Sequence, residues 1–535
     1  MQHRVGSFER PITRRQWICR AGHALGTAAL AGAAGCSVGR RRGPAANTVT
    51  VLYPADEWVL GPEWDMSAQL MVFLPLAVTN RRGELEGRLA ERWEHSADFR
   101  KWTIRLRDDI RWHDGAPVTA HDIKFTLDLL AHPDVLYYSP DAYQAKLVDD
   151  LTYTVTCRQY ACTGIPLDDW RTYYPKHLLS KLDPKGFYGW DFWKHPVGNG
   201  PFRHVRTVDR TMIELEANPD YFRGRPKIKK VILKFAGTRA VPELESGTVD
   251  AAIWVNRADV LKLAGDPRFR VYQRVFSGRH SVLFWNHRNP LFAETSVRKA
   301  LTLAINRREL YQLLNYPAGT PICDASPSFR QLTRRDFPDP IPYDPVSANR
   351  LLDAAGWDRR NQQGIRERNG KAFDFNLVCD FGSSDGHGEA VVYIQAALKR
   401  VGVRMNIRPL DEADVNRRVK DGDYEAAIGT VNIYGASSEA SVDGTHLRQP
   451  FDAAGYVSPK LIGLFGRLWR AVDPDEVDRV LRDIAALFQQ DVPATFLFPP
   501  VATTVASTRI RGEENCNGEG DITGCMESLW LEGAG

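Results

Sequence analysis

Long apolar runs are almost absent from the 535-residue sequence. A helix that crosses a bilayer needs about 20 mostly apolar residues, and after Gly35 the strongest candidate, Leu70 to Val78, has only nine. A large excess of charge is missing too, since the formal net charge is +4 and part of it lies in the basic N-terminal segment. Proteins that bind phosphate backbones carry concentrated basic faces, so we expect no nucleic-acid partner.

Metal-binding and nucleotide-hydrolysing motifs are missing as well. The sequence contains no CxxC pair and no HExxH or Walker motif, and its thirteen histidines are scattered rather than spaced as ligands. Structural zinc sites need closely spaced Cys and His pairs, and the other two motifs mark metalloproteases and nucleotide-hydrolysing enzymes. We therefore predict no metal site and no cofactor.

One catalytic pattern is present. Gly382 to Gly386 fits the G-x-S-x-G nucleophile motif with Ser384 at its centre, after a strand-like run and before a helix. A serine hydrolase would also need a later histidine, which is His446 apart from the adjacent His387. A Gly/Ser turn that joins a strand to a helix explains the same residues, and we retain the hydrolase as the alternative to a binding protein.

The N-terminal segment is typical of an exported protein. The pair Arg14-Arg15 precedes an Ala-, Gly- and Leu-rich stretch from Ala21 to Gly35. A basic start, a modest apolar region and small residues at the exit make up a secretory signal, and the arginine pair resembles a twin-arginine signal. We predict a signal peptide over residues 1–36 and a solvated tether over 37–46. Cys36 is the candidate for lipidation, although Ala33 stands where a lipoprotein box usually has Leu.

Six of the eight cysteines remain beyond this segment. An even number in an oxidising compartment predicts disulfides. Two pairs are close in sequence and would form local loops, which leaves a third pair by elimination. The candidates are Cys157 with Cys162, Cys516 with Cys525, and Cys323 with Cys379.

Strand-like and helix-like segments alternate along the rest of the chain. Lys101 to Leu106 alternates apolar and polar residues as a half-buried strand does. Ala390 to Val401 has the spacing of an amphipathic helix that ends at Gly402, and Asn306 can cap a helix that begins after it. Mixed elements over this length predict an α/β fold of several lobes.

Several blocks resemble the family 5 extracellular solute-binding proteins, the peptide, nickel and oligosaccharide receptors of ABC importers. The first block begins at Leu89 and reads LAERWEHSADFRKWTIRLRDDIRWHDGAPVTAHDIKFTLDLL. Others follow in the family's order from about residue 49 to about 500. They are VGNGPF from Val197, ANPDYFRGRPKIKKVILKF from Ala217, ESGTVDAAIWV from Glu245, WNHRNPLFAETSVRKALTLAINRREL from Trp285, YDPVSANRLLDAAGW from Tyr343 and LKRVGVRMNIRPLD from Leu398.

The resemblance implies a two-lobed periplasmic-binding-protein fold of type II, in the large cluster with an accessory subdomain. Its first lobe would be discontinuous and would use residues 47–81, 198–281 and 493–535. The accessory subdomain would span 82–197, and the second lobe 282–492.

The same resemblance implies where a solute would bind. Carried over position by position, its contacts are Trp254, Trp285, Asn286, Asn432 and Tyr434. Core packing explains the aromatic residues equally well. Trp58 and Trp64 are weaker candidates from the first lobe.

One departure from the family bears on the solute. Peptide-binding members have an Asp after the strand that here reads Glu425 to Thr430, and it holds the ammonium group of the ligand. Here Val431 to Ala436 contains neither Asp nor Trp. Glu439 and Asp443 come later and are possible substitutes, but a polar solute without an ammonium group is the simpler interpretation. A nickel site is not expected, because His280 and His287 are each better explained as lone surface histidines.

The resemblance therefore implies a receptor without enzymatic activity. It would act as a monomer in the periplasm or on the outer face of the cytoplasmic membrane. It would capture a peptide or another polar small solute and deliver it to an ABC permease. A sensor that feeds a signalling protein would use the same fold.

Overall fold

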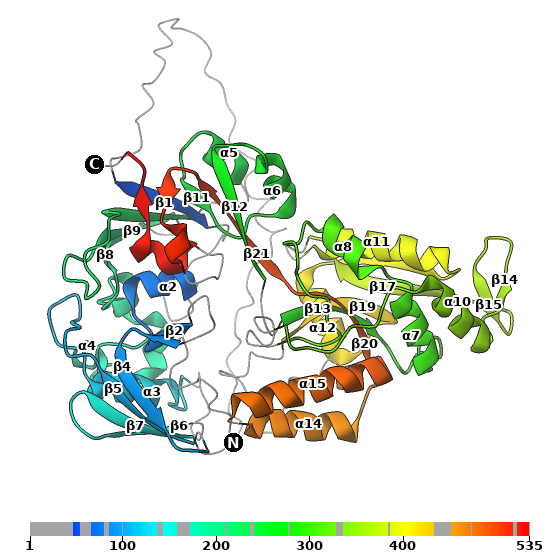
Figure 1. Cartoon of the computed structure of the whole chain (residues 1–535), viewed down its shortest axis with the longest axis horizontal. Helices are drawn as coiled ribbons and strands as arrows, with labels where there is room; N and C mark the ends of the chain where they lie inside the picture. The colour runs from blue at the N-terminus through cyan, green and yellow to red at the C-terminus, as the bar shows by residue number, and fades with distance from the viewer. Residues whose placement is uncertain are drawn as a thin grey trace, which may run out of the picture. The chain divides into compact units, whose positions relative to one another are not determined.

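The computed structural model describes most of the chain after residue 46 (Figure 1). The described ranges are 47–53, 66–79, 85–98, 100–135, 143–157, 172–208, 211–235, 240–275, 279–327, 335–382, 386–432, 451–471, 473–516 and 522–533. Residues 44–535 form one compact unit, and the account below concerns this unit. The predicted signal and tether, with Cys36, lie outside the described residues.

A seven-stranded mixed sheet organises the first lobe. Its order is β12-β21-β11-β1-β10-β9-β8, and β1 (Thr48–Tyr53) pairs in parallel with β10 and β11 while the other pairs are antiparallel. The β1 segment is rich in Val and Thr and almost wholly buried, as expected for a central strand with both faces covered. The other strands are β8 (Phe202–Val208), β9 (Met212–Ala217), β10 (Lys230–Phe235), β11 (Ala251–Ala252), β12 (Phe269–Val275) and β21 (Val501–Ser507).

Shorter elements cover this sheet. Leu52 packs with the residues of α5 and α6 on one face, whereas Val51 and Tyr53 belong to a larger core on the other. The covering helices are α2 (Met66–Val72), α5 (Ala240–Glu245), α6 (Arg257–Leu263) and the 3₁₀ helices η5 (Glu513–Asn515) and η6 (Ile522–Ser528). Two small ribbons pair β2 (Ala77–Thr79) with β3 (Leu85–Gly87) and β22 (Ile510–Arg511) with β23 (Trp530–Leu531).

The accessory part contains a four-stranded antiparallel sheet of order β4-β5-β7-β6. Its strands are β4 (Ala90–His95), β5 (Lys101–Leu106), β6 (Tyr143–Leu147) and β7 (Thr152–Cys157), and its helices are α3 (Ala120–Leu130), α4 (Lys176–Leu179), η2 (Pro184–Gly189) and η3 (Asp191–Lys194). The strand predicted over Lys101 to Leu106 is confirmed, and the Asp122 carboxylate accepts a hydrogen bond from the Thr119 backbone N–H (2.8 Å) at the start of α3.

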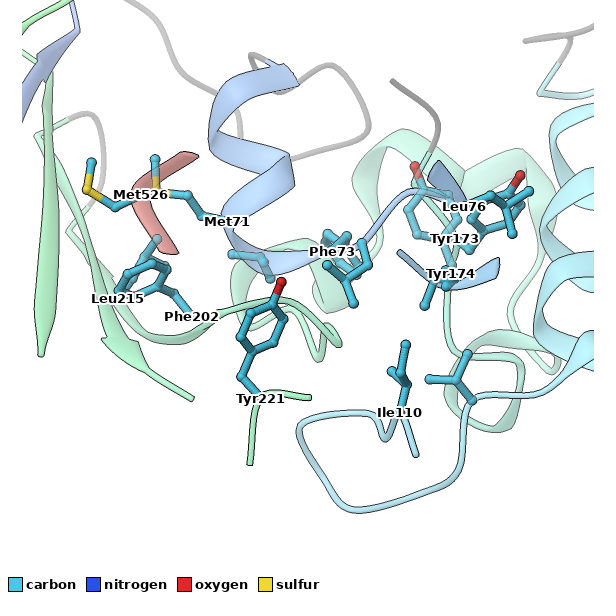
Figure 2. Close-up of a cluster of buried hydrophobic side chains, with 14 of the residues drawn as sticks. Met71, Phe73, Leu76, Ile110, Tyr173, Tyr174, Phe202, Leu215, Tyr221 and Met526 are labelled. Carbon is cyan, nitrogen blue, oxygen red and sulfur yellow. The ribbon is translucent and has the colours of Figure 1, made fainter. Parts of the chain in front are cut away.

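One hydrophobic cluster joins the accessory part to the first lobe. Figure 2 shows a section of it, in which Met71, Phe73, Tyr174 and Phe202 come from both parts. Two glycines allow the close approach, because a Cβ at Gly198 would lie only 1.9 Å from the carbonyl oxygen of Val72 and one at Gly200 would also clash. This packing accounts for the glycines of the VGNGPF block.

The second lobe has a five-stranded sheet of order β18-β17-β19-β13-β20. The strands are β13 (Arg279–Trp285), β17 (Asp374–Asp380), β18 (Arg404–Leu410), β19 (Ala426–Asn432) and β20 (Ala494–Phe498). The side chains of β13 alternate between two cores, with Leu283 and Trp285 on one face and Val282 and Phe284 on the other. The sheet is therefore buried on both sides.

Helices cover both faces of this sheet. One face carries α7 (Thr295–Leu303), α8 (Arg307–Leu313), α10 (Pro345–Ala354) and α11 (His387–Arg400), and the other carries the hairpin of α14 (Pro459–Arg470) and α15 (Pro474–Asp491) (Figure 1). The lobe also includes α12 (Glu412–Asp421) and a ribbon of β14 (Arg359–Arg360), β15 (Arg366–Arg368) and β16 (Lys371–Ala372). The predicted Asn306 cap is confirmed, since its Oδ1 accepts from two N–H groups of α8.

The α/β, two-lobed architecture is as predicted, but strand pairing moves two lobe boundaries. β13 begins at Arg279 and β20 ends at Phe498, and both strands pair within the second sheet. The predicted divisions after residues 281 and 492 therefore assign 279–281 and 494–498 to the wrong sheet. No helix in the described ranges is long and apolar enough to span a bilayer.

Candidate functional site

The chain passes between the two sheets at two adjacent places. β12 leads to β13, and β20 leads to β21 with only Pro499 and Pro500 between them. β12 and β21 pair antiparallel up to Val275 opposite Val501, and β13 pairs with β20 from Ser281 opposite Phe498. We refer to these two connections as the hinge, because a few residues at element ends can absorb a change in backbone angles.

A small crevice lies beside this hinge and has walls from both lobes. Its volume is about 50 Å³, enough for a few water molecules. The first lobe contributes the start of α6 together with β12 and β21, and the second contributes the loop after α8 and the start of α11. The described lining residues are Val255, Arg257, Val260, Gln273, Leu314, Asn315, Tyr316, Gly386, Val501 and Thr503.

Two polar contacts bridge the lobes at this crevice. Arg257 Nη1 lies 3.6 Å from Glu389 Oε1, and Gln273 Nε2 donates to the carbonyl oxygen of Asn315 (2.9 Å). Tyr316 Oη also donates to the carbonyl oxygen of Pro499 in the second connection. These contacts join the two lobes beside the two connections.

Trp254 is the predicted contact residue that lies nearest to this crevice in the chain. It follows β11 and precedes Val255 and Arg257, which line the crevice. Its side chain is 37% exposed and its φ is +52°. A bulky residue with positive φ is strained, and such strain persists where the surroundings fix the conformation, often at binding sites.

Trp285 lies in the hydrophobic core of the second lobe. It has no exposed surface, its ring packs against Phe292 (centroids 5.1 Å apart), and its Nε1 donates to Thr495 Oγ1 (3.1 Å). Core packing was the alternative explanation for the aromatic candidates, and Trp285 is packed in this way. In the described conformation Trp285 presents no surface to a solute, and we assign it a structural role.

Asn286 also makes contacts within its own lobe. Its Nδ2 donates to the carbonyl oxygen of Tyr424 (2.6 Å), and its Oδ1 accepts from the backbone N–H of Arg288 (3.1 Å). The amide thereby connects the end of β13 to the turn before β19. Both polar atoms of the Asn286 side chain, Nδ2 and Oδ1, therefore form hydrogen bonds within the second lobe.

The other predicted contacts and several alternatives lie outside the described residues. The backbone of Asn432 ends β19, but its side chain and Tyr434 are not described. The same holds for Trp58, Trp64, Glu439, Asp443, Ser384 and His446. His387 is described, and its Nε2 lies 3.0 Å from Ser281 Oγ in a buried contact between α11 and β13.

In its described residues, the structure contains one of the predicted disulfides and contradicts another. Cys516 and Cys525 are bonded, with their Cα atoms 5.1 Å apart. Cys323 and Cys379 are free and buried, so the third pairing is wrong. Cys323 lies in a loop beside Asp324, whereas Cys379 faces the core from near the end of β17. Burial raises the pKa of their thiols to about 12 and about 11. The Cys157–Cys162 pair lies outside the described side chains.

The histidines near the hinge are not surface residues, contrary to expectation. His280 is 1% exposed, and burial lowers its pKa to about 3 with a smaller contribution from Arg307. His287 is partly buried, its Nε2 lies 3.1 Å from the carbonyl oxygen of Pro493, and burial lowers its pKa to about 4. The described residues contain no group of three or more His, Cys, Asp or Glu side chains that could hold a metal.

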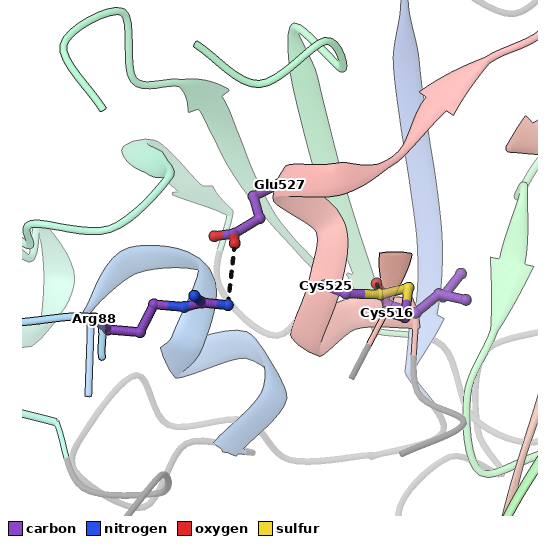
Figure 3. Close-up of a disulfide and its surroundings, with 5 residues drawn as sticks. Arg88, Cys516, Cys525 and Glu527 are labelled. Atoms are coloured by element: carbon purple, nitrogen blue, oxygen red, sulfur yellow. Dashed lines mark hydrogen bonds and ion pairs between the residues drawn. A yellow bond between two sulfur atoms is a disulfide. The ribbon is translucent and has the colours of Figure 1, made fainter. Parts of the chain in front are cut away.

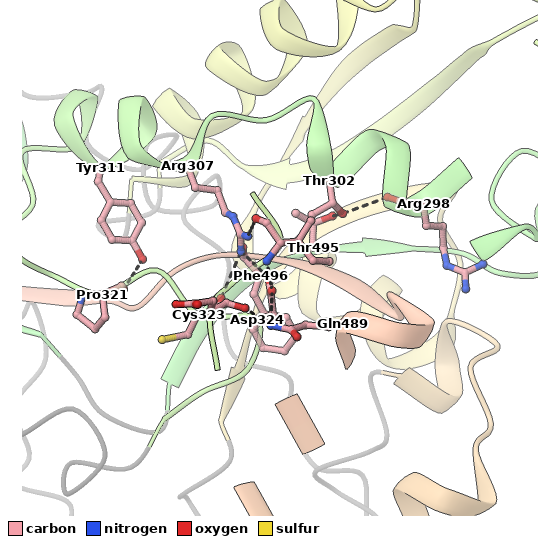
Figure 4. Close-up of polar contacts among 12 residues, drawn as sticks. Arg298, Thr302, Arg307, Tyr311, Pro321, Cys323, Asp324, Gln489, Thr495 and Phe496 are labelled. Carbon is pink, nitrogen blue, oxygen red and sulfur yellow. Dashed lines mark hydrogen bonds and ion pairs between the residues drawn. The ribbon is translucent and has the colours of Figure 1, made fainter. Parts of the chain in front are cut away.

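A buried ion pair supports the hinge from the second lobe, and sequence reasoning missed it. Arg307 Nη1 donates to Asp324 Oδ1 (2.6 Å) and to the carbonyl oxygen of Phe496 in β20 (2.9 Å) (Figure 4). Asp324 Oδ2 accepts from the Ile341 N–H (2.6 Å). Both charged side chains are at most 5% exposed. No local pattern marks the pair, because its partners meet only after α8 and β20 have packed together.

A second arginine, Arg298, binds the segment of the chain that immediately precedes β20. Arg298 of α7 donates through Nε to the carbonyl oxygen of Val492 (2.8 Å) and through Nη2 to that of Asp491 (2.7 Å). These are the last carbonyl groups of α15, and Val492 has a φ of +46°. Arg298, in the segment from Val297 to Ala300, therefore holds the end of α15 just before β20.

Comparisons with known proteins agree with this geometry. The family model described as bacterial extracellular solute-binding proteins, family 5 Middle, matches residues 84–446. A Brucella ovis relative is 29% identical over 356 residues, and the match spans 64% of this chain and 64% of the relative. The oligopeptide-binding protein AppA of Bacillus subtilis is 24% identical over 446 residues (80% of this chain, 81% of AppA). The nickel-binding periplasmic protein of Escherichia coli is 26% identical over 401 residues (71% and 74%).

Solved structures share the fold. NikZ from Campylobacter jejuni, in complex with Ni(L-His), superposes with a TM-score of 0.71 at 20% identity and covers 91% of this chain and 100% of NikZ. The ABC transporter substrate-binding protein CtaP from Listeria monocytogenes gives 0.74 at 20% identity, with coverage of 90% and 99%. Together with the family match over most of the chain, the two sheets and their paired connections identify this chain as a member of the bacterial extracellular solute-binding proteins of family 5.

Proposed function

We propose that the protein is the solute-binding receptor of an ABC importer. It captures a peptide or another polar small solute between its lobes and delivers the solute to a membrane permease. The observation that carries the proposal is the pair of adjacent connections, β12 to β13 and β20 to β21, in a chain of this family. The names of its relatives include binding proteins for oligopeptides and for nickel.

The physical basis of capture is a shift between open and closed arrangements of the lobes. A ligand that contacts both lobes favours the closed arrangement by the difference between its affinities for the two. Closure excludes water, which makes a few polar contacts selective. Trp254, exposed in the first lobe beside the hinge, is the described residue best placed to contact the solute.

A ligand screen tests the proposal directly. Peptides, oligosaccharides and nickel complexes are added separately to the purified protein, and its melting temperature is recorded. A ligand at about 100 times its dissociation constant stabilises the folded state by about 2.7 kcal/mol, so a true solute gives a clear shift. Small-angle X-ray scattering should show a smaller radius of gyration with that solute. Binding without contraction would contradict capture by closure, and no response to any of the three classes would contradict binding of peptides, oligosaccharides and nickel complexes.

The receptor performs no chemistry on its solute in this proposal. An organophosphate probe that labels nucleophilic serines should leave Ser384 unmodified, while a known serine hydrolase in the same reaction is labelled. Modification of Ser384, read by peptide mass spectrometry, would instead support the hydrolase alternative.

Export and anchoring complete the proposal. Residues 1–36 direct the chain out of the cytoplasm by a twin-arginine route, and Cys36 is lipidated, so the monomeric receptor stays near its permease. Mass spectrometry of the mature N-terminal peptide would detect the lipid, and Cys36→Ser should release the protein from membranes. Genes for a permease and an ATPase beside this one would favour import over sensing.

A further inference from the structure

A polar cavity lies in the first lobe, and none of the hinge strands lines it. Its volume is about 430 Å³, which is within the range of small-molecule sites. The walls come from β3 and the residue after it, from the loop between β9 and β10, and from η6. The described lining residues are Glu86, Arg88, Tyr221, Arg223, Gly224, Arg225, Lys227, Gly524, Cys525, Glu527 and Ser528.

Four cations and two carboxylates line this cavity, and the carboxylates are already paired. Glu527 Oε1 accepts from Arg223 Nη1 (3.1 Å) and lies 3.5 Å from Arg88 Nη2 (Figure 3), while Glu86 Oε1 accepts from Arg88 Nη1 (2.6 Å). Burial raises the pKa of Glu86, but the hydrogen bond and charge of Arg88, together with Arg223, outweigh it and hold this pKa below its ordinary value. Both arginines are therefore paired with carboxylates of the cavity wall.

The other two cations have no carboxylate partner among the described residues. Arg225 and Lys227 are both exposed, and the Nζ atom of Lys227 lies 4.6 Å from the centre of the Trp530 ring. The described lining thus carries two positive charges in excess of its negative charges. A phosphate monoester carries about −1.5 to −2 charges at neutral pH, so its charge matches this excess.

A disulfide and a buried hydrogen bond tie the segments of the cavity wall to the first lobe. The Cys516–Cys525 bond closes the segment that carries η6 (Figure 3), and Tyr221 is buried in the core of Figure 2 with its Oη donating to Glu527 Oε2 (2.5 Å). Burial and the neighbouring Glu527 raise the pKa of Tyr221, so the hydroxyl stays protonated and keeps donating. Gly224 has a φ of +90° and turns the loop so that Arg223 and Arg225 both line the cavity. A preformed wall reduces the entropy that binding would cost.

We propose that this cavity binds a phosphate group, either of a small free phosphate or of an anionic lipid headgroup. Arginine is suited to this role because its planar fork of N–H donors matches phosphate oxygens. Arg225 and Lys227 make the primary contacts, and the Arg88–Glu527–Arg223 network holds the wall behind them. The site is separate from solute capture at the hinge and does not depend on it.

Isothermal titration calorimetry with inorganic phosphate, at constant ionic strength against chloride, tests the site. We expect one phosphate per chain. Arg225→Gln combined with Lys227→Gln should weaken binding by about tenfold or more, since hydrogen bonds to charged groups contribute on this scale. The matched control is Lys181→Gln with Lys185→Gln, which removes the same charge from exposed positions outside the cavity and should leave the affinity unchanged.

A second arm separates the two sources of phosphate. Vesicles of phosphatidylcholine with phosphatidic acid, whose headgroup is a phosphate monoester, and of phosphatidylcholine alone are sedimented with the protein and with both double variants. Binding only to the vesicles that contain phosphatidic acid, lost with Arg225→Gln and Lys227→Gln but kept in the control, would assign the site to a lipid headgroup. Binding of inorganic phosphate with the same variant pattern would assign it to a free phosphate. Absence of both, or equal binding by the two double variants, would overturn the proposal.

Discussion

Arg257 at the start of α6 lies 3.6 Å from Glu389 in the first turn of α11, and this ion pair joins the two lobes beside their hinge. The two side chains are 24% and 46% exposed, so the pair contributes no more than about 1 kcal/mol. That amount changes the ratio of two lobe arrangements about fivefold, because 1.4 kcal/mol corresponds to a factor of ten. A weak contact at a hinge thus has a measurable effect on the populations of the two lobe arrangements, even though it contributes little to the free energy of folding.

Removal of this ion pair should shift the lobe arrangement without unfolding the protein. We expect Glu389→Gln to change the small-angle scattering profile of the ligand-free protein, because the described arrangement loses an attraction that other arrangements lack. The charge-reversed pair of Arg257→Glu with Glu389→Arg should restore the original profile. Glu412→Gln, at an exposed position of α12, is the control and should have no effect. Identical profiles for Glu389→Gln and the control would exclude a role for the pair.

The stability of the protein should fall on mild acidification, in part through His280. Burial lowers the pKa of His280 to about 3 in the folded state, against 6.5 ordinarily. Below pH 6.5 the unfolded chain binds a proton that the folded state does not, so the free energy of unfolding falls with pH, by about 1.4 kcal/mol for each pH unit from this residue. The contribution of neutral His280 to the stability of the folded state is fully present above pH 6.5. It is lost as the pH falls towards the pKa of His280 in the folded state.

A variant isolates this contribution. Neither ring nitrogen of His280 has a hydrogen-bond partner among the described residues, so His280→Leu removes a titrating group without breaking a described hydrogen bond. Urea unfolding at about pH 7.5, 6 and 5 should show a shallower pH dependence for His280→Leu than for the wild type. Parallel dependences would mean that His280 is protonated or hydrated in the folded protein.

The Arg307–Asp324 pair should be far more important for folding than a surface pair. Asp324→Ala leaves the Arg307 charge buried without its carboxylate, and loss of one partner of a buried pair costs about 3–5 kcal/mol. Asp336→Ala, which removes the partner of Arg482 at the surface, should cost less than about 1 kcal/mol. Urea denaturation of both variants measures the difference. Similar losses would show that the buried pair is no stronger than the exposed one.

The free thiols that the structure describes, those of Cys323 and Cys379, should be unreactive until the protein unfolds. Their pKa values, raised by burial to about 12 for Cys323 and about 11 for Cys379, keep them as neutral thiols at pH 8, and the thiolate is the reactive form. Iodoacetamide should leave both unmodified in the native protein and label both in urea, as read by peptide mass spectrometry. Cys516 and Cys525 should stay unlabelled in urea unless a reductant is added. Failure of Cys323 and Cys379 to react in urea would indicate that they are oxidised.

Much of the secondary structure follows from local patterns. The alternation of Lys101 to Leu106 predicts β5 with both of its ends, and Asn306 predicts the start of α8. The lobe boundary near residue 492 was less accurate because the chain remains apolar and extended on both sides of the second crossing. Only the pairing partners decide that Phe496 belongs to the second sheet and Val505 to the first.

Trp285 shows why a contact residue is harder to predict than a fold. Trp285 occupies a position that the family resemblance marks as a contact, yet alternation along β13 points its ring into the core with Leu283. Arg257 and Glu389 carry no signal in the sequence, because each is one of many charged residues on a helix. Proximity between distant segments is what makes them a pair.

The sequence by itself determined the α/β class, the alternation of buried and exposed positions, and the blocks that assign the chain to its family, because these depend on residues near one another in the chain. The tertiary structure alone decided which strands pair across the hinge, which tryptophan is buried, and that Cys323 and Cys379 stay apart while Cys516 and Cys525 join. It also brought Arg88, Tyr221 and Glu527 around one polar cavity. The physical reason is that burial and pairing depend on contacts between distant segments, which local periodicity does not encode.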